Sequence, residues 1–173
     1  MPSPTSAAAV ANWFLDRQSR ETSPVPLIDQ MKIQKLVFYA HAWWLALRDG
    51  ALFDDDVYAW PWGPVVQSIY GEFRNFGREP IGDKRATVLE PAANAWTFNM
   101  RRPDAPPQDV QDFLEQIWNL HKGLTGIQLS NATHAPGEPW TVIKEQLGNL
   151  DGKPLIPNDL IKELFRRKLP AAN

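Results

Sequence analysis

The segment from residue 30 to residue 48 restricts the fold most, because apolar side chains lie almost all around the helix that it predicts. It reads QMKIQKLVFYAHAWWLALR. Apolar residues spaced three and four apart define one face, while Phe38 and Leu45 lie on nearly the opposite side. A helix that is apolar on two faces is normally surrounded by other elements. We therefore expect residues 30–48 to form the central helix of the fold.

Capping residues and prolines divide the rest of the chain into shorter elements. Ser6 and Asp29 are placed to cap the first helix and the central helix, and Gly50 is placed to end the central one. Residues 57–60 predict a short strand, and residues 86–99 predict a β-hairpin around PAAN. The remaining helices are expected at residues 7–18, 64–77, 108–123, 125–134, 139–147 and 157–169.

This element pattern predicts a mainly α fold: one compact helical domain with a central apolar helix and a small β-hairpin or short sheet. The chain of 173 residues is long enough for one ordinary domain with a sizeable core. We expect that domain to span residues 1–173, with residues 1–5 and 170–173 as frayed termini.

Composition restricts both the chemistry and the surroundings of the protein. The absence of cysteine excludes a disulfide framework, a thiol nucleophile and a cysteine-based zinc site. A net charge of −2 gives no general attraction to nucleic acid or to an anionic membrane. No stretch approaches the roughly 18 apolar residues of a membrane span. We expect a cytoplasmic protein with no membrane partner.

The polar residues do not form a recognisable catalytic or metal-binding pattern. His41, His121 and His134 lack the spacing of a helical ligand pair, and residues 54–56 lack the spacing of a calcium loop. Ser130 precedes His134 by one helical turn, but no acid is placed to orient the histidine. Glycine-rich phosphate loops are absent too. We expect a protein that is not an enzyme, with no catalytic residue, metal or cofactor.

Two basic clusters leave a nucleic-acid function open as an alternative. They are Arg101–Arg102 and the run from Arg166 to Lys168. A helical domain with a hairpin could be a winged-helix reader of DNA. However, basic residues near a linker or a helix C-terminus are also favoured by the helix dipole alone. Nucleic acid is therefore not the partner that we expect.

The stretch YAWPWGP, residues 58–64, predicts a stiff corner with an aromatic floor. Pro61 and Pro64 fix a turn from strand to helix, Gly63 permits the sharp bend, and Pro64 begins the next helix. We assign Gly63 and Pro64 to architecture. Trp60 and Trp62 flank the turn and can close over the central helix.

Aromatic side chains near this corner are our candidates for binding a protein partner. Lys35 and Tyr39 lie one turn apart on the margin of the central helix, where Trp60 and Trp62 can pack nearby. Together they would form a concave aromatic patch with one cation, a composition typical of interface hot spots. A second candidate patch consists of His134 and Trp140. Tryptophans beside prolines are also candidates for the core, so both interpretations of these rings stay open.

Three separated motifs resemble those of a known family. They are K-x-x-K-L-x-[FY]-[YA] at residues 32–40, A-W-x-x-G-P-V at residues 59–65, and L-x-x-x-T-H-x-x-x-x-P-W at residues 129–140. Their order and spacing resemble the Panacea domain of the SocA-like antitoxin family, which includes phage-associated GepA-type proteins. The resemblance covers about residues 7–169. The Trp-Pro-Trp corner is more aromatic than the usual version in this family.

The resemblance implies a mainly helical antitoxin of a type II toxin–antitoxin system. Such a protein neutralises a cognate protein toxin, encoded nearby, by direct contact. One branch of the family acts as a proteolytic adaptor that delivers its toxin to an ATP-dependent protease. The alternative function is a DNA-binding regulator of a phage or mobile-element operon. Neither the identity of the toxin nor the oligomeric state follows from the sequence.

Overall fold

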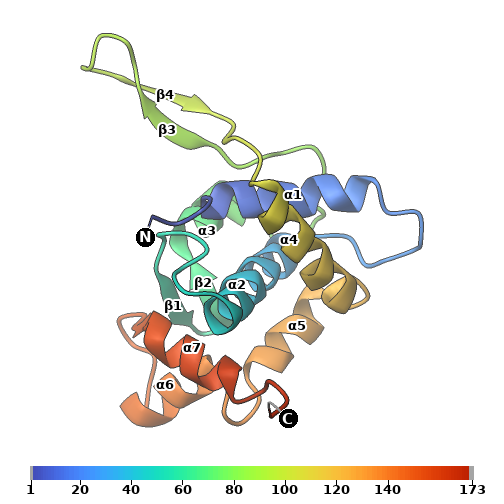
Figure 1. Ribbon diagram of the computed structural model, residues 1–173, viewed down its shortest axis with the longest axis vertical. Coiled ribbons are helices and arrows are strands. Elements are labelled where there is room, and N and C mark those ends of the chain that lie inside the picture. The colour runs from blue at the N-terminus through green and yellow to red at the C-terminus, as the bar shows by residue number, and fades with distance from the viewer. Residues whose placement is uncertain (1, 172–173) are drawn as a thin grey trace.

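Helix α2 (Gln30–Leu47) runs through the centre of the molecule in a computed structural model that describes residues 2–171 (Figure 1). Fourteen of its 18 residues are buried, and α2 is in contact with helices from both halves of the chain. The side chain of Asp29 accepts a hydrogen bond from the backbone N–H of Lys32 and thereby caps the helix. The expected central helix is confirmed.

Most of the other helices pack directly on α2, whereas the helix at residues 139–147 packs on its neighbouring helices and on the small sheet. Ser6 caps the first of them by accepting a hydrogen bond from the N–H of Ala9, as the sequence indicates. Within residues 2–171 these helices are α1 (Ala7–Ser19), α3 (Gln67–Phe73), the 3-10 turn η1 (Arg74–Phe76), α4 (Gln108–His121), α5 (Gly126–Thr133), α6 (Pro139–Leu147) and α7 (Asn158–Arg166).

The corner is a β-hairpin, so the expectation that Pro64 begins a helix is wrong. Strand β1 (Val57–Trp60) pairs in antiparallel register with β2 (Gly63–Val66), and α3 begins only after β2. Gly63 has a φ of 116°, which turns the chain straight back onto β1. The valines that follow are β-branched and favour extended backbone. Proline fits here because β2 is an edge strand, at the end of the order β2-β1-β5.

Strand β5 (Leu155–Ile156) completes this sheet by pairing with the other edge of β1. It is too short to give a sequence pattern and was not expected. The separate pair β3 (Val88–Pro91) and β4 (Phe98–Arg101) forms the expected second hairpin, which projects from the helical body (Figure 1). Helices dominate the described residues, so the mainly α, single-domain fold is confirmed.

One local expectation about α2 needs correction, and two of its polar residues are buried. The helix ends at Leu47 with an extended Arg48, so Gly50, whose φ is 107°, lies beyond the cap. The polar positions Gln34 and His41 are buried, because each forms hydrogen bonds inside the fold: Gln34 with β2, and His41 with Asn158.

No helix within residues 2–171 is long and apolar enough to cross a membrane. Residue 1 and residues 172–173, which belong to the termini expected to fray, lie outside the described part of the chain.

Candidate functional site

The three sequence motifs meet at the β1–β2 corner. Lys35 reaches it from α2, Gly63 belongs to the corner itself, and Thr133 comes from the end of α5. A Cβ atom added to Gly63 would lie 2.8 Å from Cε and Nζ of Lys35 and from Oγ1 of Thr133. Glycine is therefore required for space as well as for its positive φ. Residues about 70 positions apart in the sequence thus form one close-packed junction.

Helix α2 holds the outgoing strand of the corner through two polar side chains. Nζ of Lys35 donates a hydrogen bond to the carbonyl oxygen of Pro64 over 3.1 Å. The Gln34 side chain accepts a hydrogen bond from the N–H of Val66 over 3.0 Å and donates to its carbonyl over 3.2 Å. Buried backbone groups need such partners, and an edge strand leaves them without a neighbouring strand. These two polar residues of the first motif segment therefore have an architectural role.

The third motif holds the turn from the opposite side. Oγ of Ser130 donates to the carbonyl oxygen of Trp62, and Nε1 of Trp140 donates to that of Trp60, each over 2.7 Å. The Ser130 hydroxyl is thus directed at the corner backbone instead of at His134. The carbonyl oxygens of Trp62 and Trp60 thus accept hydrogen bonds from side chains of two different helices, α5 and α6.

Lys35 is buried at this junction, and burial lowers the pKa of its ammonium group to about 7. A side chain so enclosed is not available to a docking protein in this conformation. Tyr39, the other predicted patch residue of α2, stacks on His121 with ring centroids 4.6 Å apart, and burial raises its pKa. The corner borders two cavities, of about 520 and 120 Å³, and Tyr39 lines neither of them. A direct role of either residue in toxin binding remains a prediction.

The buried ammonium group of Lys35 makes stability depend on pH. Its pKa is about 7 in the folded chain and about 10.5 when exposed, so between these values only the unfolded chain keeps the proton. The free energy of unfolding is therefore expected to rise between pH 7 and pH 9, by up to about 1.4 kcal/mol per pH unit for one proton. Below pH 7 the lysine is charged in both states and this contribution is constant.

Urea unfolding of the unaltered chain and of Lys35→Met at pH 7 and pH 9 checks this expectation. The variant should show a smaller rise, because only the buried Lys32, whose pKa burial lowers to about 8, still contributes in the same direction. Equal rises for both proteins would contradict the assignment to Lys35.

Trp62 is the aromatic residue of the corner that faces solvent, with 71% of its surface exposed, and it follows the exposed Pro61. It lines a cavity of about 520 Å³ together with Met31 from the start of α2 and Ile127 from α5. Trp60, in contrast, is half-buried, between the ring of Tyr70 and the ammonium group of Lys153. Lys35, Trp60 and Trp62 line the second cavity, of about 120 Å³, so the structure brings together three of the four residues of the predicted patch. They differ in exposure, however: Trp62 is accessible, Trp60 is partly covered, and Lys35 is buried, as is Tyr39, which does not line this cavity.

The second candidate patch joins the first through this cavity. The rings of His134 and Trp140 stack with centroids 3.9 Å apart. Trp140 is buried, whereas His134 lines the same cavity as Trp62. Burial and the nearby ammonium groups of Lys35 and Lys144 lower the pKa of His134, which favours a neutral ring. The accessible part of the candidate site thus combines Trp62, His134 and apolar residues from two helix ends with polar residues such as Arg78 and Asn131.

Sequence reasoning did not find the apolar members of this surface. Ile127 and Met31 occur in helices, where apolar residues normally face the core. Their positions near helix ends leave them accessible, and only the packing of neighbouring elements shows this. Within residues 2–171 no three histidine or acidic side chains gather as a metal site.

The comparisons with known proteins agree with the motifs that build the corner. The family model described as "Antitoxin SocA-like, Panacea domain" matches residues 33–141, which include the corner and most of the other two motifs. Antitoxin SocA from Caulobacter vibrioides (strain NA1000 / CB15N) is 29% identical over 170 residues, which cover 95% of this chain and 85% of that protein. No solved structure matches the chain. The chain therefore belongs to the SocA-like antitoxin family and contains its Panacea domain.

Proposed function

We propose that this protein is the antitoxin of a type II toxin–antitoxin system and that it neutralises a cognate protein toxin by direct binding. Membership of the antitoxin family carries the proposal, together with a similarity to Antitoxin SocA that covers nearly the whole chain. The geometry supports binding instead of catalysis or a cofactor. The polar side chains of the motifs form hydrogen bonds with the corner's own backbone, and an exposed tryptophan borders a cavity beside them.

Expression of the neighbouring gene with and without this protein tests the proposal. The neighbouring gene product alone is expected to arrest growth, and co-expression of this protein is expected to restore it. A neighbouring gene that is harmless alone, combined with binding of this protein to its own promoter DNA, would instead establish the alternative function, a DNA-binding regulator of a phage or mobile-element operon.

Direct binding can neutralise a toxin in two ways, and the amount of toxin measured during co-expression distinguishes them. An antitoxin that covers the active surface of the toxin leaves the amount of toxin unchanged. An antitoxin that acts as a proteolytic adaptor lowers the amount, and a strain without the ATP-dependent protease then loses the rescue. Both mechanisms need direct contact with the toxin, and the exposed apolar surface at the corner is suited to burial by such a partner.

Replacement of Trp62 by alanine should weaken binding of the toxin about thirtyfold, because a buried interface tryptophan commonly contributes about 2 kcal/mol or more. The fold should remain intact, since this ring is mostly exposed in the free protein. Leu120→Ala is the matched control, because Leu120 is 70% exposed on α4 and lies outside the cavity. Isothermal titration of the purified toxin into each variant gives the affinities. Equal affinities for both variants would remove Trp62 from the toxin-binding surface.

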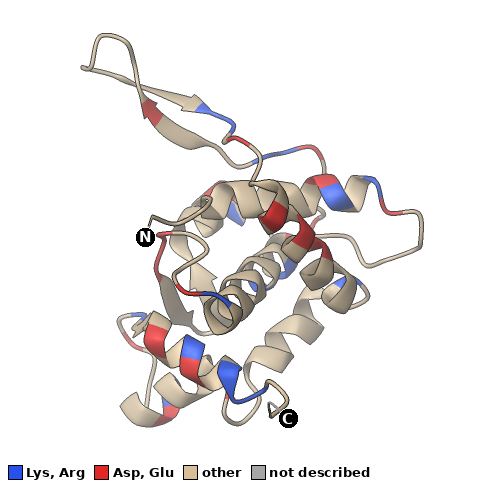
Figure 2. Cartoon of the chain, viewed as in Figure 1, with Lys and Arg blue, Asp and Glu red and all other residues tan. Residues whose placement is uncertain are grey.

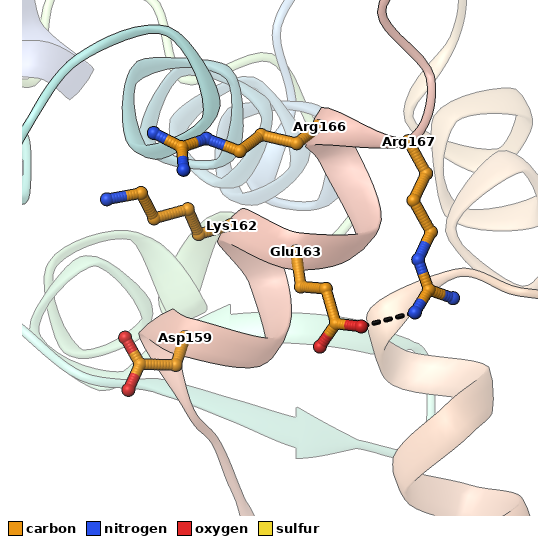
Figure 3. Close-up of a pocket in the computed structure, with 5 residues that line it drawn as sticks. All are labelled: Asp159, Lys162, Glu163, Arg166 and Arg167. Carbon is orange, nitrogen blue, oxygen red and sulfur yellow. Dashed lines mark hydrogen bonds and ion pairs between the residues drawn. The ribbon is translucent and has the colours of Figure 1, made fainter.

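The basic cluster on α7 does not favour the DNA-binding alternative. A hollow of about 570 Å³ on this helix is lined by acidic as well as basic side chains. Figure 3 shows Asp159 and Glu163 on the same helix as the cations. Arg167 forms an ion pair with Glu163, and Lys168 forms one with Glu138. A DNA phosphate would have to compete with these carboxylates for the cations.

The second basic cluster is neutralised in the same manner. Arg101 forms ion pairs with Glu90 over 2.9 Å and with Asp104 over 3.2 Å, and Arg102 forms one with Asp16. Acidic and basic residues follow one another along α7, and elsewhere on the ribbon they are scattered (Figure 2). We therefore propose a protein partner and no nucleic acid.

A further inference from the structure

The hairpin of β3 and β4 carries an exposed apolar face. Leu89 pairs with Met100 and Pro91 pairs with Phe98, and these four residues lie on the same face because side chains alternate along a strand. Leu89, Met100 and Phe98 are each exposed over about two thirds of their surface, at 69%, 67% and 66%. The hairpin stands away from the helical body (Figure 1). This face is therefore apolar and open to solvent.

The opposite face of the hairpin is polar apart from Val88, which packs against the core, and this makes the two-stranded sheet amphipathic. Arg101 and Glu90 form an ion pair there, and Asn99 lies opposite Glu90. An antiparallel sheet with one apolar face normally packs that face on a core. A two-stranded hairpin without a covering layer is only marginally stable in water. The pattern is thus that of a sheet which another surface completes.

The tip of the hairpin presents a tryptophan on an ordered turn. Trp96 is 91% exposed. Oδ1 of Asn94 accepts hydrogen bonds from the N–H groups of Trp96 and Thr97 and from the hydroxyl of Thr97. Ala95 adopts a φ of 58°, a left-handed conformation that is uncommon for a residue other than glycine. A turn fixed in this way lowers the entropy cost of placing the indole in a partner.

Area and charge distinguish between the possible occupants of this face. Side chains of this size each bury about 150–250 Å² when fully covered, so at the observed exposures the apolar residues of the hairpin would contribute about 500 Å². Two copies packed on this face alone would then bury about 1,000 Å² in total, less than the roughly 1,200–2,000 Å² of a stable interface. A toxin that also covers the Trp62 surface at the corner, as proposed above, buries a larger area. The cations beside the face are already paired with carboxylates, so anionic ligands are not favoured.

We infer that the apolar face of the β3–β4 hairpin, together with Trp96, is a docking arm for an apolar surface of the protein toxin. This inference rests on the proposed function and adds a binding surface that is separate from the corner. The toxin supplies the missing layer over Leu89, Phe98 and Met100 and a recess for the indole. The complex thereby adds stability to a hairpin that is already formed in the free chain.

Two substitutions in the full-length chain test the docking arm: Phe98→Ala on the apolar face and Trp96→Ala at the tip. Each is expected to weaken binding of the purified product of the adjacent toxic gene about thirtyfold in isothermal titration. Asn99→Ala is the matched control, because it changes the opposite face of the same strand, and its affinity should stay within about threefold of the unaltered chain. Thermal melts should be unchanged in all three, since each side chain is exposed.

The results separate the inference from the function on which it rests. If the unaltered chain binds the toxin and both hairpin variants bind equally well, the docking arm is refuted while the proposed function stands. If the unaltered chain does not bind, the proposed function fails and the arm fails with it. Sedimentation analysis of the free chain tests whether a second copy occupies this face instead. A dimer that Phe98→Ala dissociates would assign the face to a second copy and overturn the inference.

Discussion

Gly63→Ala is expected to destabilise the protein by about 2–6 kcal/mol, enough to unfold an ordinary domain at the upper end. The new Cβ would lie 2.8 Å from atoms of Lys35 and Thr133. Neither side chain can move away freely, because Lys35 donates to Pro64 and Thr133 donates to Ser130 inside the junction. The φ of 116° adds backbone strain for any residue with a side chain.

Urea unfolding of Gly63→Ala beside Gly71→Ala checks this expectation. Gly71 lies within helix α3, and a Cβ there would meet no atom within 4 Å. That control should raise the free energy of unfolding by about 0.5–1 kcal/mol, because alanine favours the helix. If Gly63→Ala unfolds at the same urea concentration as the unaltered chain, the motifs do not form the close-packed junction described above.

Trp140→Ala is expected to cost about 3–5 kcal/mol of unfolding free energy, because a large buried ring is removed and a cavity remains. Only 4% of Trp140 is exposed. The substitution also removes the hydrogen bond to the Trp60 carbonyl and the stacking on His134. Rescue of growth from the toxin should therefore fall through loss of folded protein.

Trp62→Ala is the matched control for Trp140→Ala, since Trp62 belongs to the corner and Trp140 donates a hydrogen bond to the corner backbone, but the two rings differ in exposure. Its free energy of unfolding should stay within about 0.5 kcal/mol of that of the unaltered chain. Thermal melts of the two variants beside a growth-rescue assay give both quantities. Equal destabilisation by the two substitutions would show that exposure in the free protein does not separate core from surface at this corner.

The sequence predicted those parts of the fold that local patterns determine. The apolar circumference of α2 and the capping side chains of Ser6 and Asp29 require no tertiary information. Pro64 was misassigned because its φ suits both the first turn of a helix and an edge strand. The choice depends on Gln34, which is 32 residues away and satisfies the backbone of Val66.

The sequence predicted where the candidate site lies, but it did not predict which of its side chains are exposed. The tryptophans beside the turn correctly indicated that the corner packs near α2, and Lys35 of α2 does contact the corner. A lysine and a tyrosine on the margin of a helix are normally accessible, however, and here both are buried by α5, α4 and α7. The apolar face of the hairpin was also not recognised, because alternating apolar residues in a strand normally indicate a buried face.

The central claim is that this protein neutralises its toxin by direct binding and leaves the toxin chemically unchanged. Size-exclusion chromatography of the purified pair, followed by intact-mass spectrometry of the eluted species, tests it most directly. We predict one peak that contains both proteins, each at the mass encoded by its gene. Separate elution at micromolar concentrations despite growth rescue, or a toxin with an altered mass, would contradict the claim.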